Sequence, residues 1–166
     1  GGMEFEYRAV PVMKLVVEAL SQLQGYASKL GVAFELAERW DDAYVWADPG
    51  RMLQVLNNLL SNAAKFSPSG EQVMVSVQPV DGQVRVAVSD RGPGIPEDFR
   101  DKLFDKFTQA DASDTREVGG TGLGLSVAAR IVEDHQGELM LIDSSDHDRG
   151  SVFAIELPVD LRPEGA

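Results

Sequence analysis

Two asparagines and a lysine stand at helical spacing within residues 53–66. Asn58, Asn62 and Lys65 follow one another at intervals of four and three residues, so an α-helix would place them on one face. Amide oxygens can ligate a hard cation, and an ammonium group neutralises a phosphate. The stripe is therefore typical of a site for a ligand that carries both a metal ion and phosphates. For this segment alone, the solvent-facing polar side of an ordinary amphipathic helix is an equally good interpretation.

The same segment has an apolar face that would hold the stripe in place. Asp48 is a good N-cap and Pro49 a good first helical residue, so we expect the helix to begin there and to end before the Pro68-Ser69-Gly70 turn. The residues predicted to face the core are Met52, Val55, Leu56, Leu59, Leu60 and Ala63.

Asp90 follows an alternating run, residues 84–89, that reads as a β-strand. The turn after it contains Gly92 and Gly94, which would let a planar ring approach the backbone. The Asp90 carboxylate could accept a hydrogen bond from an exocyclic amine. Alone, these residues are better explained as an ordinary turn, because Asp, Gly and Pro are common turn formers.

A glycine-rich stretch, residues 119–125, opens the helix predicted over residues 123–136. Backbone N–H groups at such a helix entrance, together with the helix dipole, attract anions. The spacing matches neither the dinucleotide fingerprint nor the P-loop, so those two nucleotide folds are not indicated. A flexible linker is the alternative interpretation of this stretch.

In this order the motifs resemble the ATP-binding catalytic domain of bacterial sensor histidine kinases, within the GHKL ATPase superfamily. Residues 58–66 resemble the N box of that family, 90–95 the G1 box, 104–107 the F box and 120–125 the G2 box. The similarity runs from about residue 5 to residue 157. It implies an α/β two-layer sandwich of the Bergerat type, with a mixed β-sheet and helices packed on one face.

The resemblance also implies ATP as substrate, Mg²⁺ as cofactor and a role for each matching residue. Asn58, Asn62 and Lys65 would be the catalytic set, with Asn62 as the metal ligand, and Asp90 would read the adenine amino group. The further residues expected to contact the nucleotide are Phe66, Gly92, Gly94, Ile95, Phe107, Thr115, Arg116, Gly120, Thr121, Gly122, Leu123 and Gly124. The long polar connection 105–120 would be the ATP lid.

Asn58 occupies the position at which hydrolysing relatives carry a glutamate that activates water. An amide cannot act as a general base, so slow hydrolysis is expected. The resemblance implies transfer of the γ-phosphoryl group to a histidine on a separate dimerisation hairpin that this chain lacks, and then to a response regulator. A nucleotide-binding pseudokinase and a serine kinase of the anti-sigma-factor type are the alternatives, and a non-enzymatic interaction domain ranks third.

Neither of the two histidines has the context of a phosphoacceptor. His135 would lie in the last turn of a helix, where a positive charge suits the dipole, and His147 would lie in a loop. Neither pairs with another histidine at helical spacing, which argues against a zinc site.

Composition predicts one globular domain over residues 3–160, with residues 1–2 as an expression remnant and 161–166 as a tail. The net charge of −12 and the lack of a basic stripe argue against nucleic acid as a partner. The absence of cysteine and of a long apolar run fits a monomeric cytoplasmic fragment without membrane contact, whose parent protein could be membrane-anchored.

Alternating and periodic patterns predict the remaining elements. We expect an edge strand over residues 4–10 and a helix over 11–30 that ends at Gly31. Three hairpins are expected, formed by residues 32–40 with 43–47, 73–80 with 83–89, and 138–142 with 151–157.

Overall fold

A computed structural model describes residues 5–90, 121–142 and 152–160, and these form one layer of helices on one layer of strands. The remaining residues lie outside the description. The elements, in chain order, are β1 (Arg8–Pro11), α1 (Val12–Lys29), β2 (Ala33–Glu38), β3 (Tyr44–Ala47), α2 (Pro49–Phe66), β4 (Gln72–Val80), β5 (Gln83–Ser89), α5 (Thr121–Asp134), β6 (Glu138–Ile142) and β7 (Val152–Pro158).

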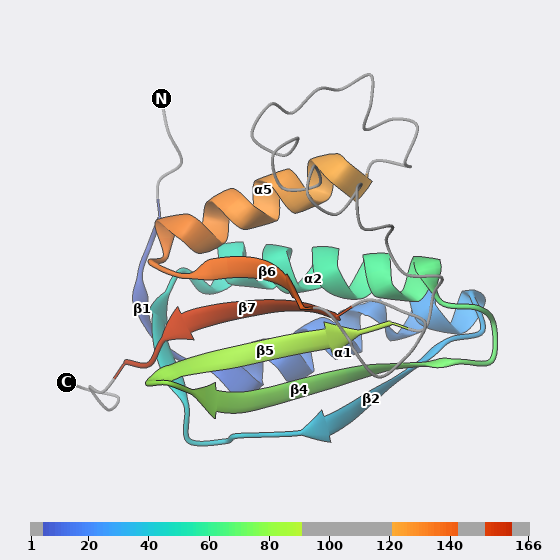
Figure 1. The fold of residues 1–166 in the computed structure, drawn as a ribbon, viewed down its shortest axis with the longest axis horizontal. Helices are drawn as coiled ribbons and strands as arrows, with labels where there is room; N and C mark the ends of the chain where they lie inside the picture. Colours follow the sequence, from blue (N-terminus) through green and yellow to red (C-terminus); the bar gives the residue numbers. More distant parts are fainter. Residues whose placement is uncertain (1–4, 91–120, 143–151, 161–166) are drawn as a thin grey trace.

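The main sheet has five strands in the order β2-β4-β5-β7-β6, and α1, α2 and α5 cover one of its faces (Figure 1). β2 runs parallel to β4, and the other neighbours are antiparallel, so the sheet is mixed. The predicted fold class is confirmed. The β4–β5 and β6–β7 hairpins are confirmed as well. Asp81 and Gly82 link β4 to β5 with φ angles of 52° and 79°, as a two-residue turn of the primed type requires.

The first predicted hairpin is wrong, because β2 and β3 do not pair with each other. β2 joins the edge of the main sheet beside β4, whereas β3 pairs with β1 in a separate two-stranded sheet. Phe34 and Leu36 of β2 lie in register with Val73 and Val75 and so add to the helix-facing side of the sheet. Their apolar alternation indicated the buried face correctly, but it carried no information about the neighbouring strand.

The predicted first strand is shorter than expected and belongs to the small sheet. β1 spans Arg8–Pro11, and α1 follows it directly. The N–H of Val12, at the start of α1, donates to the carbonyl of Ala43 over 3.0 Å and so ties the helix start to the beginning of β3. Gly31, with a φ of 75°, follows α1, as predicted for a residue that ends a helix.

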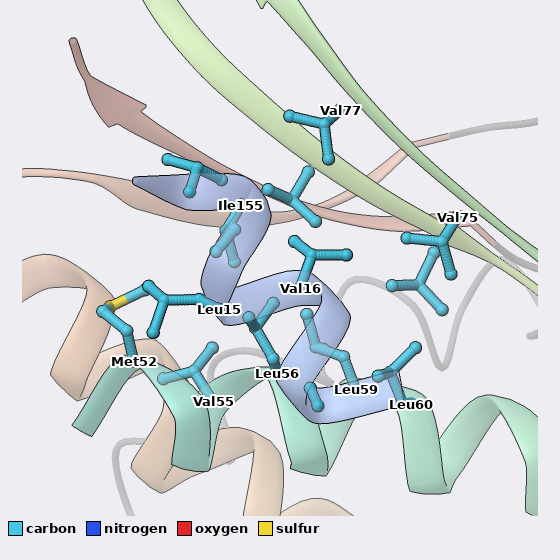
Figure 2. Close-up of a cluster of buried hydrophobic side chains, with 14 of the residues drawn as sticks. Leu15, Val16, Met52, Val55, Leu56, Leu59, Leu60, Val75, Val77 and Ile155 are labelled. Atoms are coloured by element: carbon cyan, nitrogen blue, oxygen red, sulfur yellow. The ribbon is translucent and has the colours of Figure 1, made fainter. Parts of the chain in front are cut away.

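The apolar face predicted for α2 is confirmed, because all six expected residues are buried. Figure 2 shows that the five larger ones point, with Leu15 and Val16 of α1, toward Val75, Val77 and Ile155 of the sheet. Each of these large side chains contributes about 1.5–3 kcal/mol by leaving water. This burial fixes the rotation of α2 about its own axis, and with it the direction of the carboxamide stripe.

Asp48 and Pro49 begin α2 as predicted. The Oδ1 atom of Asp48 accepts a hydrogen bond from the N–H of Arg51 over 3.1 Å, and Pro49 is the first helical residue. Partial burial by itself would raise the pKa of the Asp48 carboxyl. The N–H groups of Glu6, Arg51 and Gly50 and the Arg51 guanidinium outweigh this effect, so that pKa lies below its ordinary value.

Candidate nucleotide site

The carboxamide stripe lies on the flank of α2 that is turned away from α1. On the opposite flank, the Nδ2 atom of Asn57 donates to Oε1 of Gln22 in α1 over 3.0 Å. Asn58, Asn62 and Lys65 follow from Asn57 by helical rotation onto the other side, and α5 packs there. Figure 1 shows the same order, with α2 between α5 and α1. The stripe therefore belongs to the α2–α5 boundary.

The N-terminus of α5 stands level with Asn62. The two helices run in opposite directions, and the N–H of Asp48, which caps α2, donates to Nε2 of His135, just beyond α5, over 3.1 Å. Asn62 comes fourteen residues after Asp48, and Thr121 comes fourteen residues before His135. At 1.5 Å per residue, both lie about 21 Å from that contact. The N-terminus of α5 and Asn62 therefore stand at a similar distance along the helix pair from the contact between Asp48 and His135.

Asp90 lies at the same end of the molecule. Ser89, the last residue of β5, is in register with Met74 near the start of β4, and β4 follows the end of α2 after a short turn. Asp90 comes next and is only 6% exposed. The structure thus places the second half of α2, the beginning of α5 and the end of β5 toward one end of the molecule. Residues 58–66, Asp90 and residues 121–125 are the described parts of three sequence motifs found there.

The stripe itself grades from half-buried to exposed toward the end of α2. Asn58 and Asn62 are half-buried, Lys65 is exposed and Phe66 is 44% exposed. The Oγ atom of Ser61 donates to the carbonyl of Asn58 over 3.2 Å, within the helix. The amide groups are therefore partly shielded from water, and the ammonium and the aromatic ring stand at the rim.

Several predicted site residues lie outside the described part of the chain. These are Gly92, Gly94, Ile95, Phe107, Thr115, Arg116 and Gly120, together with the lid predicted over residues 105–120. Thr121, Gly122, Leu123 and Gly124 are placed in the first turn of α5 by their backbone alone. That turn carries no acidic side chain, so no carboxylate there opposes an anion at the helix N-terminus.

His135 lies just beyond the end of α5, and its ring makes two hydrogen bonds that are part of the fold. Its Nε2 atom accepts from the N–H of Asp48, so Nδ1 is the ring atom that donates to the carbonyl of Ile131, over 2.7 Å. The ring is 4% exposed. Asp48 and His135 are 87 residues apart, and no local sequence signal indicated this contact. His147 lies outside the description.

Two negative findings hold for the residues that the structure describes. None of these helices is long and apolar enough to cross a membrane. In the same residues, no group of three or more His, Cys, Asp or Glu side chains is arranged to hold a metal ion.

Residues 47–161 match the family described as histidine kinase-, DNA gyrase B- and HSP90-like ATPases. The chain belongs to this ATPase family. It is 33% identical over 158 residues to the sensor-like histidine kinase SenX3 of Mycolicibacterium smegmatis, covering 94% of this chain and 40% of SenX3. It is 38% identical over 119 residues to the sensor histidine kinase WalK of Bacillus subtilis, covering 70% of this chain and 19% of WalK. The chain thus spans well under half of these relatives.

Solved histidine kinase structures share the fold. The catalytic domain of the histidine kinase ThkA superposes with a TM-score of 0.76 at 29% identity, over 93% of this chain and 96% of that domain. The full-length kinase ShkA, solved with AMPPNP, superposes with a TM-score of 0.76 at 28% identity, over 96% of this chain and 32% of ShkA. The predicted resemblance to histidine kinase catalytic domains is confirmed.

Proposed function

We propose that this chain is the catalytic domain of a two-component sensor histidine kinase, formed by residues 3–160. It binds MgATP, and in the parent protein it transfers the γ-phosphoryl group to a histidine on a dimerisation hairpin. The observation that supports this proposal is that the α2 carboxamide stripe, the N-terminus of α5 and Asp90 lie toward the same end of the molecule. The family match and the histidine kinase relatives support it.

The side chains suit the parts of MgATP that they would contact. Asn62 would ligate Mg²⁺ with help from Asn58, because amide oxygens are hard, neutral ligands. When bound, the metal ion neutralises phosphate charge. Lys65 would contact a phosphate, and the first turn of α5, with Gly120, Gly122 and Gly124, would surround the phosphates with backbone amides. Asp90 would accept a hydrogen bond from the adenine amino group.

The chain's own residues would position the reactants and neutralise their charge, which is how phosphoryl transfer is generally accelerated. Asn58 offers no basic group beside the phosphates, so water is not activated there. The histidine of the acceptor hairpin would serve as its own nucleophile. The domain alone would therefore hold ATP with little turnover. Arg116 and the lid, residues 105–120, would complete the site around the terminal phosphate.

The setting of the domain follows from the same proposal. Its partners would be the dimerisation hairpin of its own kinase and a response regulator. One solved relative, the histidine kinase ThkA, is described in complex with the response regulator protein TrrA. The domain would act in the cytoplasm, as a monomer when separated from the hairpin.

The test measures transfer and metal dependence together. The purified chain, incubated with MgATP and its cognate hairpin, should place an acid-labile phosphoryl group on the hairpin histidine and none on His135 or His147. Asn62→Ala should abolish the difference between ATP affinities measured with magnesium and with a chelator. Tyr26→Ala, at an exposed position on α1, is the matched control and should change neither result.

Two results would overturn parts of this proposal. Rapid ATP hydrolysis by the isolated chain would contradict the role given to Asn58. Tight ATP binding without transfer to any cognate hairpin would favour the pseudokinase, and phosphoserine on an added protein would favour the serine kinase.

A further inference from the structure

A cavity of about 400 Å³ lies at the opposite end of α5 from the proposed nucleotide site. It is lined by residues of β3, of the end of β7 and of the turn after α5. Figure 1 shows that α5 and β7 end on the same side of the molecule. Its floor is apolar, formed in part by Val45 and Leu157, which are 1% and 3% exposed. Ligand sites usually measure about 300–1,000 Å³, so this cavity is large enough for one long side chain.

Two aromatic side chains border the cavity and remain open to solvent. Tyr7 is 36% exposed and Trp46 is 46% exposed. Tyr7 is also held in place: its hydroxyl donates to the carbonyl of Asp134 over 3.1 Å, and its ring centroid lies 5.6 Å from that of Phe5 and 5.1 Å from that of His135. One wall of the cavity is therefore ordered before any ligand arrives, which reduces the entropy lost on binding.

The charged side chains among the described residues that line the cavity are negative. They are Asp134 and Asp160, and no lysine or arginine belongs to this described lining. The N–H of Asp160 donates to the carbonyl of Tyr44 over 2.7 Å, which ties the chain after β7 to β3. The pKa of the Tyr7 phenol is raised, first by partial burial and then by the nearby carboxylates of Asp134 and Asp48. A cation would be attracted into this surrounding, and an anion repelled.

We propose that this cavity binds an arginine side chain presented by a protein partner. The flat guanidinium would stack against Trp46 or Tyr7 while its N–H groups reach Asp134 and Asp160, and the aliphatic stem would cover Val45 and Leu157. Arginine suits these walls better than lysine, because lysine presents a compact, strongly hydrated charge. Arginine, tyrosine and tryptophan are also the side chains that most often dominate protein interfaces.

The probe for this proposal is the peptide acetyl-Ala-Arg-Ala-amide, titrated into the whole chain and followed by the indole N–H resonance of Trp46. That resonance should shift, while the resonance of Trp40 should not. The peptide in which citrulline replaces arginine has nearly the same shape without the charge and should bind at least about fivefold more weakly. The affinity of the corresponding lysine peptide should lie between those of the arginine and citrulline peptides. Added salt should weaken binding of the arginine peptide, because the exposed carboxylate of Asp134 is screened.

Variants locate the site and keep it separate from the nucleotide. Trp46→Ala and Asp160→Asn should each lower the affinity for the arginine peptide about two- to fivefold. For Trp46→Ala the shift is read from backbone resonances of Val45 and Val159. Tyr26→Ala is the control, an exposed aromatic outside the cavity, and should leave binding unchanged. Unchanged MgADP affinity in each variant shows that the fold is retained.

The proposal fails if the citrulline peptide binds as well as the arginine peptide, or if no shift is seen with the arginine peptide at the highest soluble concentration. It also fails if neither Trp46→Ala nor Asp160→Asn weakens binding. Failure of the wild-type chain to bind MgADP would count against the proposed kinase function and would leave the cavity result standing.

Discussion

The two ends of the α2–α5 helix pair are built for different tasks. At one end, a hydrogen bond between Asp48 and His135 joins the start of α2 to the end of α5, and the rings of Phe5 and Tyr7 pack against His135. At the other end, half-buried amides and an exposed lysine line the boundary between the helices, and the helix entrance of α5 adds its backbone N–H groups. Polar groups at the first end hold the fold, and those at the second end are the ones that we propose bind the nucleotide.

At the first end, the position of α5 along α2 is fixed. Asp48 shows how this is done, because its carboxylate accepts hydrogen bonds from Glu6 and Arg51 while its N–H donates to His135. One residue thereby fixes the position of α5 along the axis of α2. Variants at the fixed end should change stability, and variants at the open end should change ligand affinity.

The largest effect is expected for His135→Ala at the fixed end. The variant removes two hydrogen bonds and leaves a space beneath Phe5 and Tyr7, so the free energy of unfolding should fall by about 2–4 kcal/mol. Urea unfolding measures this change. MgADP affinity of the folded variant should remain within about threefold of wild type. A stability change below about 1 kcal/mol would contradict the role given to this ring.

Asp90→Asn at the open end should lower nucleotide affinity and change stability little. The amide would face an amino group with a donor, which costs about 1–3 kcal/mol, or roughly ten- to hundredfold in ADP affinity. Because the two side chains have the same shape, the urea midpoint should change little. Titration calorimetry gives the affinity. Unchanged ADP binding would remove Asp90 from the site.

Asp48→Ala should reduce stability by about 1–2 kcal/mol at neutral pH, because α2 loses its cap. Since the native pKa of Asp48 is lowered, its carboxylate stabilises the wild-type fold fully above the ordinary value of 3.8. That stabilisation is lost as the pH falls below 3.8 through the lowered native pKa. The difference between wild type and variant should therefore shrink in acid. A difference that stays constant with pH would show that the cap acts without its charge.

The smallest effect is expected for Tyr7→Phe, which removes only the hydroxyl bonded to the carbonyl of Asp134. That bond lies in an exposed place, so the free energy of unfolding should fall by about 0.5–1 kcal/mol. Thermal unfolding of both proteins under the same conditions measures it. A loss as large as that of His135→Ala would mean that the hydroxyl, rather than the ring packing, holds this end together.

Periodicity predicted the elements well because it records which face of a helix or strand is buried. The apolar face of α2 and the Asp81-Gly82 hairpin were correct for this reason. The pairing of β2 with β4 was not predicted, because Phe34 and Leu36 would be buried equally well in either arrangement. Partner choice depends on contacts between distant segments, which alternation does not record.

The same limit applies to the candidate site. Helical spacing placed Asn58, Asn62 and Lys65 on one face, but the neighbour of that face followed only from the contact between Asn57 and Gln22. The position of Thr121 relative to Asn62 along the helix pair followed only from the contact between Asp48 and His135. The roles assigned to these residues in nucleotide binding stay predictions.

The strand order of the main sheet has a consequence for how the protein is made. β7, the last of the described strands, lies between β5 and β6 and pairs along the whole of β5, with Gln83 opposite Pro158. A chain still emerging from the ribosome therefore presents β5 as an open edge until residue 158 has been synthesised. Such late, long-range pairing slows folding and exposes strand edges to neighbouring chains. This domain can complete its sheet only after nearly all of its sequence has been translated.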